Sequence, residues 1–361
     1  MTLTLPIFLT MTLASVVVGV YLERKVSAFI QDRLGPMEVG KWGLLQLVAD
    51  LLKLVQKEDI VPAAADGKLF LFAPFVIFTS IFAGFAVMPL SPSLEGSQAH
   101  VGVFFLMTIL SVDVIGILMA GWGSNNKYAL FGAMRSVAQI VSYEIPLGLS
   151  ILCVIMTTQT LNLQTISYMQ GIHADAPVYL FGIKDWGIDI SQVGGFLSWN
   201  IVQNPFLLLA YVVFFITTLA ECNRAPFDLP EGESELVGGF HTEYTGFRWA
   251  LLFLSEYAIM LLVSLLGAVL FLGSWNTPLP NIGNLRLADW TSGVPGTIWG
   301  TVCGIFWLLF KALAAILVQM WVRWTLPRLR VDQLMFLCWK VLTPVALILF
   351  LCCGIWRLLM V

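Results

Sequence analysis

Residues 249–272 read WALLFLSEYAIMLLVSLLGAVLFL, an uninterrupted apolar run in which Glu256 is the one charged residue. An α-helix rises about 1.5 Å per residue, so a run of this length crosses the apolar core of a bilayer, which is about 30 Å thick. A transmembrane β-barrel would instead show alternating strands of about ten residues. The run therefore predicts a membrane-spanning helix.

Apolar runs of comparable length recur along the chain. The predicted spans are residues 3–21, 69–90, 101–122, 136–157, 205–221, 249–272, 299–321 and 335–357. The first run has no charged n-region and no small-residue cleavage site, so it predicts a retained helix rather than a signal peptide. The sequence thus predicts an all-α fold, a polytopic transmembrane helical bundle with about eight spans in a single domain over residues 1–361.

The composition excludes several other classes of protein. Of 361 residues, 58% are hydrophobic and 11% charged, whereas a soluble domain carries about 25% charged residues. Six cysteines without regular spacing do not fit a secreted disulfide scaffold. With 19 Lys and Arg against 22 Asp and Glu, and no basic run, the chain is not expected to bind nucleic acid.

Basic residues predict the orientation in the membrane. The loops after the first, third, fifth and seventh spans hold 14 Lys and Arg, against 2 in the other three loops between spans. By the positive-inside rule the first set is cytoplasmic, so both termini are expected on the outer side. The long segment 158–204 is then an external loop, to which no chemistry is assigned.

Residues 42–57 of the first cytoplasmic loop predict an amphipathic helix that lies in the membrane interface. Two readings remain open for it: simple anchoring, and a lipid-facing doorway for an amphiphilic substrate. Its apolar face comprises Trp42, Leu45, Val48, Leu52 and Val55, and its polar side comprises Asp50, Lys53 and Lys57.

Ionisable residues within the spans are costly, at about 3 kcal/mol or more each on insertion scales. They are Asp113, Glu144, Glu256 and Lys311, with Glu221 at the end of the fifth span. Such groups either form a buried salt bridge between helices or serve a proton relay or ion path. Lys311 shares a helix face with Gly304, so we expect it to point into protein.

Two further features concern proton chemistry. Pro146 follows Glu144 by two positions and should free the carbonyl of Ser142, a common way to make a hydrated pocket. The loop at residues 222–248 is acidic: residues 221–243 hold six acids and one base, interleaved with aromatic and aliphatic residues. Packed carboxylates titrate as a coupled set, so this loop could hold or release protons.

The chain lacks CxxC, HxxxH, HExxH and GxGxxG patterns. Since clustered thiolates hold iron–sulfur clusters and a glycine-rich turn cradles phosphates, we expect no metal, cluster or nucleotide cofactor to be bound by this chain itself.

Four long motifs, in order, carry a family resemblance. They are ERKV at 23–26 running on to QDRLGP at 31–36, RSVAQIVSYEIP at 135–146, AECNRAPFD at 220–228 with GFR at 246–248, and RWTLPRLRVDQL at 323–334. Together they resemble the signature of the H-type (first) membrane subunit of respiratory complex I, over nearly the whole chain.

The resemblance implies a subunit of a proton-translocating NADH:quinone oxidoreductase in a bacterial plasma (inner) membrane rather than a mitochondrial one. Such a subunit anchors the peripheral arm and forms much of the quinone chamber. Its partners are the quinone-site peripheral subunits, the adjacent small membrane subunits and membrane lipids. Quinone is the substrate, and flavin and iron–sulfur clusters are expected in partner subunits.

The resemblance also carries roles over to matching residues. Those implied for the quinone chamber are Glu23, Arg24, Arg33, Arg224, Asp228, Glu231, Glu233 and Glu235. Arg224 is expected to be the counter-ion of the loop acids. The residues expected in a proton relay are Glu221, Glu144, Glu256, Asp113 and Lys311.

Three rival functions remain open. The nearest is the homologous membrane subunit of a membrane-bound hydrogenase-type complex, which shares the architecture but not necessarily the quinone. The second is a stand-alone ion-coupled transporter, against which the chain shows no internal inverted repeat. The third is a purely structural anchor.

Overall fold

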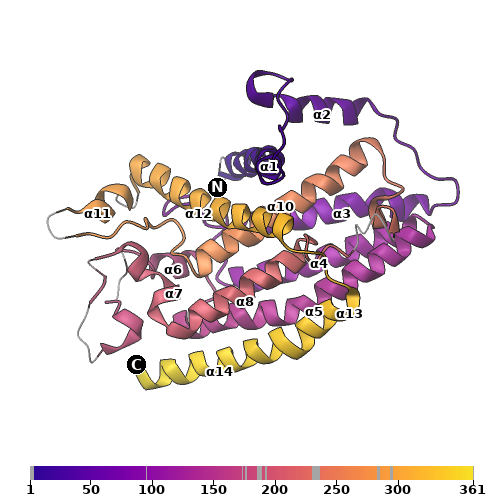
Figure 1. The fold of residues 1–361 in the computed structure, drawn as a ribbon. Coiled ribbons are helices and arrows are strands. Elements are labelled where there is room, and N and C mark those ends of the chain that lie inside the picture. The colour runs from indigo at the N-terminus through magenta and orange to yellow at the C-terminus, as the bar shows by residue number, and fades with distance from the viewer. Residues whose placement is uncertain are drawn as a thin grey trace.

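The computed structural model describes residues 4–94, 96–172, 174, 177–184, 189–191, 193–229, 236–282, 285–292 and 296–360. In this part of the chain the regular structure is helical, with two isolated β-bridges besides, so the predicted all-α class is confirmed (Figure 1). The long helices are α1 (Thr4–Ile30), α3 (Gly67–Phe85), α4 (Gly102–Gly123), α5 (Lys127–Thr158), α8 (Pro205–Glu221), α10 (Gly246–Leu270), α12 (Ile298–Thr325) and α14 (Thr343–Met360).

Six of the helical segments in the described ranges are long and apolar enough to cross a membrane. They are α3, α4, α5, α10, α12 and a continuous segment built from α13 (Val331–Phe336), the π-helix η6 (Leu337–Leu342) and α14. The apolar helix α8 is shorter, with 17 residues. Each predicted span falls on one of these helices or on α1, and the total of eight crossings stays a prediction.

Helix α10 lies at the centre of the bundle. It packs against α1, α3, α8 and α12, and every residue from Tyr257 to Leu270 is buried. A helix that is apolar on all sides has to be enclosed by other helices. The apolar run at residues 249–272 therefore forms the core of the bundle. Glu256 directly precedes the fully buried part of α10.

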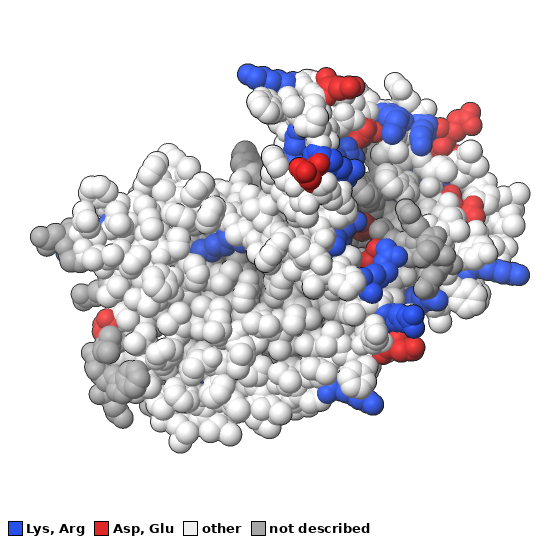
Figure 2. Space-filling view, in the orientation of Figure 1, with Lys and Arg blue, Asp and Glu red and all other residues white. Residues whose placement is uncertain are grey.

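Short helices occupy the ends of the bundle. Figure 1 shows α6 (Leu163–Tyr168), α7 (Asn200–Gln203) and α11 (Leu287–Ser292) at the end that holds the C terminus. Helix α2 (Gln46–Gln56) lies away from that end, against α1 and α10. In the face shown in Figure 2, most charged side chains gather around α1, α2 and the α12–α13 connection, and the opposite end is largely uncharged. The remaining short turns are η1 (Lys41–Gly43), η2 (Leu180–Gly182), η4 (Gly195–Ser198) and η5 (Gly239–His241).

Two helix boundaries differ from the predicted ones in a way that matters for the site. Helix α1 continues to Ile30, so Glu23 and Arg24 lie on a helix rather than in a loop. The interfacial helix begins at Gln46 rather than at residue 42, because Trp42 and Gly43 have φ values of +63° and +74°. This left-handed turn is tight: a Cβ atom on Gly43 would collide with the Pro36 carbonyl.

The proline within α5 has the predicted effect on its helix. Pro146 cannot donate to the carbonyl of Ser142, and that carbonyl instead accepts a hydrogen bond from the Cys338 thiol of η6, at 3.1 Å. The carbonyl freed in one helix thus accepts a hydrogen bond from the side chain of its neighbour, and it lies two residues before Glu144.

Candidate functional site

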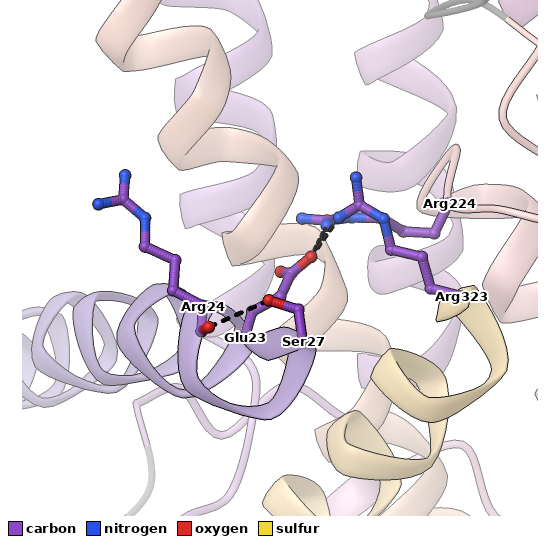
Figure 3. A network of polar contacts seen from close by, with 5 residues as sticks. All are labelled: Glu23, Arg24, Ser27, Arg224 and Arg323. Atoms are coloured by element: carbon purple, nitrogen blue, oxygen red, sulfur yellow. Dashed lines mark hydrogen bonds and ion pairs between the residues drawn. The ribbon is translucent and has the colours of Figure 1, made fainter. Parts of the chain in front are cut away.

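A buried ion cluster joins four segments that are far apart in the sequence. Glu23 on α1 is 4% exposed, and its Oε1 accepts a hydrogen bond of 2.7 Å from Nη1 of Arg224 in the loop after α8. Arg323, near the end of α12, donates to the same oxygen (Figure 3). The guanidinium of Arg224 also lies over the ring of Tyr257 on α10, 4.4 Å from its centroid. The cluster therefore ties α1, α10 and α12 to the loop after α8.

The opposite charges in this cluster stabilise one another. Burial by itself would lower the pKa of Arg224, but the carboxylate of Glu23, with further contributions from Tyr257 and Glu256, more than offsets this and raises that pKa above its ordinary value. Arg224 accordingly remains a cation. Two cations share one carboxylate, so the cluster carries a net positive charge.

The acid partner of Arg224 differs from the expected one. In the described ranges Arg224 pairs with Glu23, on α1, and not with an acid of its own loop. Asp228, which is 6% exposed, instead pairs with Arg328 at 2.6 Å. The pairing of Arg224 with Glu23 buries both charges, whereas Arg328 stays partly exposed beside Asp228. Glu231, Glu233 and Glu235 lie outside the described residues.

A second ion pair fastens the interfacial helix to α1. Nη1 of Arg24 lies 2.5 Å from Oδ2 of Asp50 on α2, and Gln46 donates to the other oxygen at 3.1 Å. Burial alone would raise the pKa of Asp50, but the hydrogen bonds from Arg24 and Gln46 and the charge of Arg24 lower it. Arg33 lies beyond α1 and is exposed, so the structure does not bring it into either ion pair.

Three of the predicted relay acids meet at a small cavity inside the bundle. Asp113 of α4, Glu221 of α8 and Glu256 of α10 all line it, and its volume is about 20 Å³, enough for one water molecule. Asp113 and Glu221 are 6% and 2% exposed, and each has one buried oxygen without a hydrogen-bond partner among the described residues. A water molecule in this space would have carboxylate oxygens as partners.

Glu144, the fourth acid, does not line that cavity. It is half-buried on α5 and lies near enough to Glu221 for their charges to interact. Its Oε1 is also buried without a partner in the described ranges. Asp113, Glu221 and Glu256 thus line one cavity, and Glu144 lies near Glu221 outside it.

The sequence reasoning missed His241, which contacts this group of acids. Its Nε2 lies 2.9 Å from Oε1 of Glu256. The chain has three histidines, and His241 is the one in the acidic loop. That position is the sequence feature that could have pointed to it. The cost of ionisable residues inside spans does not single out this histidine, because it lies outside the predicted spans. The folding of the loop between the helices brings it to Glu256.

Lys311 points into the protein, as predicted, but it lies apart from the acids. Its Nζ donates to the carbonyls of Ser274 and Asn276, at 2.8 and 2.6 Å, and lies 4.3 Å from the ring centroid of Trp199. Two carbonyls and an aromatic face satisfy an ammonium group. Lys311 therefore tethers α12 to the loop that follows α10.

We predict that Lys311→Met lowers the thermal stability of the assembled protein. The substitution leaves two buried carbonyls without a donor, and each such loss costs about 1–3 kcal/mol. The measurement is the temperature at which this chain aggregates in detergent-solubilised membranes, with the exposed Lys340→Met as the control. A variant that melts like the parent chain but has lost proton translocation would contradict the tether and favour a relay role.

A mostly apolar cavity of about 350 Å³ lies near the ion pairs, between α1, α2 and α10. Arg24 and Asp50 lie at its polar edge, and the rest of its lining is mostly apolar, including Val20, Trp249 and Phe253. A neighbouring cavity of about 490 Å³ shares Lys53, Leu54 and Trp249 with it, and continues to Tyr244 and Thr245. The two spaces lead from the interfacial helix toward the loop that precedes α10.

Comparisons with known proteins show the family of this chain. The family model "NADH dehydrogenase" matches residues 3–354. An NADH-quinone oxidoreductase H subunit of Cytophaga hutchinsonii is 62% identical over 96% of this chain and 96% of its own length. The H subunit of Chlorobaculum parvum is 53% identical over 94% of this chain and 87% of its own length, and that of Geobacillus sp. 44% identical over 93% and 87%. The chain is a multi-pass membrane protein that belongs to the NADH dehydrogenase family, among the H-type membrane subunits of respiratory complex I.

Proposed function

We propose that this chain receives a quinone from the bilayer between α1, α2 and α10, and couples its reduction by NADH-quinone oxidoreductase to proton translocation. The observation that carries the proposal is the cavity of about 350 Å³ between these helices. Its volume and its apolar lining with a few charged groups are typical of a site for an amphiphilic small molecule. A quinone with a long apolar tail and a polar head group has this chemistry.

The interfacial helix α2 gives the cavity a membrane-facing wall. None of its residues is buried, and Val48, Leu52 and Val55 are exposed on the side away from the polar residues. A helix of this composition lies with its apolar side among acyl chains. Lys53 and Lys57 are then placed to contact anionic head groups.

The surroundings of the proposed site follow from the family. Electrons would arrive from flavin and iron–sulfur clusters in partner subunits, since quinone is the substrate and this chain is expected to hold no redox cofactor. The peripheral subunits would dock at the end of the bundle that holds the loop after α8, and small membrane subunits and lipids would surround the helices. We place the complex in a bacterial inner membrane, with both termini of this chain outside.

The coupling step uses the ion cluster and the acids beside it. Arg224 contacts both Glu23 and the ring of Tyr257, and Tyr257 follows Glu256 directly on α10. A change of charge on the quinone would act on this cluster and on the acidic loop, whose Asp228 is held by Arg328. Glu221, Glu144, Asp113 and Glu256 would carry that change toward the adjacent membrane subunit.

The cavity is tested by filling it. Ala250→Phe places a ring against the lining, and we expect the KM for a long-tailed quinone to rise about tenfold, while a short, water-soluble quinone is affected less. The assay is steady-state NADH-driven quinone reduction by the purified complex. Ala314→Phe, on the exposed side of α12, is the matched control. Equal kinetics of both variants with the long-tailed quinone would refute entry through this cavity.

A further inference from the structure

His241 occupies an unusual place for a loop residue. It ends η5, in the loop between α8 and α10, yet its Nε2 lies 2.9 Å from Oε1 of Glu256, about 15 Å along α10 from the first residue of that helix. Its side chain is 11% exposed. The contact is possible because η5 inserts between helices and packs against α4 and α5.

The charged groups around this contact come from several helices. Asp113 of α4 and Glu221 of α8 line the same small cavity as Glu256, and Phe240, next to His241, lines it too. Arg224 and Arg323 act electrostatically on Glu256 from the side of the ion cluster.

The other contacts near η5 involve helix α5 and the same loop. Helix α5 approaches through Gly132, which lies against Gly239. Glu243, in the same loop, is turned away and accepts a hydrogen bond of 2.6 Å from Asn126. Among the described residues, the hydrogen bond to Glu256 joins His241 to the acids of the cavity.

We propose that His241 is the proton-transfer partner of Glu256 and links the acidic loop to the acids inside the bundle, an inference that rests on the proposed coupling function. The neutral imidazole, with its proton on Nε2, takes up a solvent proton at Nδ1. The imidazolium then gives its Nε2 proton to the Glu256 carboxylate, which leaves a neutral imidazole protonated on Nδ1 and a neutral carboxylic acid. The reverse sequence returns the proton to water.

Geometry and chemistry both support this assignment. A separation of 2.9 Å lies in the range for direct proton transfer, about 2.6–3.2 Å. Imidazole is the side chain whose ordinary pKa, about 6.5, allows both states near neutral pH, and each of its two nitrogens can hold a proton. A purely structural partner of Glu256 would need only a fixed N–H donor.

The test compares an amide with the imidazole. His241→Gln keeps an N–H donor for Glu256 but does not titrate, and His241→Asn is a second amide variant if the first fails to assemble. The whole complex is purified, reconstituted in vesicles and assayed for NADH-driven proton translocation from pH 5.5 to 8.5. We expect the rate to fall about tenfold at pH 7 and its pH dependence to flatten. His100→Gln, an exposed histidine distant in sequence, should behave like the parent complex.

The possible results separate the role of His241 from the proposed coupling function. A parental rate and pH profile in the amide variant overturns the role of His241. A reduced rate with an unchanged pH profile also overturns it, because that result is expected of a structural hydrogen bond. Glu256→Gln, assayed in parallel, tests the proposed coupling function by itself. If Glu256→Gln abolishes translocation while His241→Gln does not, the coupling function stands and this inference falls.

Discussion

Glu23→Ala is expected to remove most of the assembled complex from the membrane. The substitution leaves the buried Arg224, 7% exposed, and Arg323 without their shared carboxylate. Breaking a buried ion pair by removing one partner costs about 3–5 kcal/mol, a large part of the roughly 5–15 kcal/mol by which a typical protein is stable. The measurement is the amount of this chain in the intact complex on native gels, together with its thermal inactivation.

The neighbouring ion pair provides the control for this prediction. Arg24→Ala removes a partly exposed pair with Asp50, which contributes about 1 kcal/mol or less, so assembly should be nearly unchanged. Replacing Glu23, Arg224 and Arg323 together by apolar residues of similar size should restore assembly but not quinone reduction. Parental levels of the Glu23→Ala chain would show that this cluster does not hold the four segments together.

Glu256→Gln and Glu144→Gln are expected to lower proton translocation about a hundredfold at nearly unchanged assembly. Glutamine keeps the shape of glutamate and cannot accept a transferable proton, and loss of one positioned acid or base typically costs about 10²–10⁴-fold in rate. Glu256 lines the cavity with Asp113 and Glu221, and Glu144 interacts with Glu221. The measurement is the ratio of protons translocated to NADH oxidised in reconstituted vesicles.

Glu243→Gln is the matched control for the acid series. Glu243 lies in the same loop as His241 but is held by Asn126 and does not line the cavity. Its amide variant should translocate protons like the parent complex. Normal quinone reduction and normal translocation in both Glu256→Gln and Glu144→Gln would refute the relay, and the acids would then be structural.

The sequence alone predicts the fold class, and it singles out the buried acids that the structure brings to one cavity. A helix that crosses a bilayer must satisfy every backbone hydrogen bond within itself, so it crosses as one long apolar run. The positions of such runs can be predicted from the sequence without tertiary information. Ionisable residues in such runs stand out by their energetic cost in a bilayer, which singles out Asp113, Glu221 and Glu256, and all three line one cavity in the structure. The carbonyl freed by Pro146 was likewise predictable, because proline has no N–H to donate.

The tertiary structure decided which charges are partners. Nothing in the spacing of Glu23, Arg224 and Arg323 indicates that they share one oxygen, because α1, the loop after α8 and α12 meet only when the helices pack around α10. For the same reason the sequence assigned Arg224 to its own loop and missed His241. Apolar periodicity is a local property of the chain, whereas an ion pair between distant segments depends on helix packing, and only the assembled bundle fixes it.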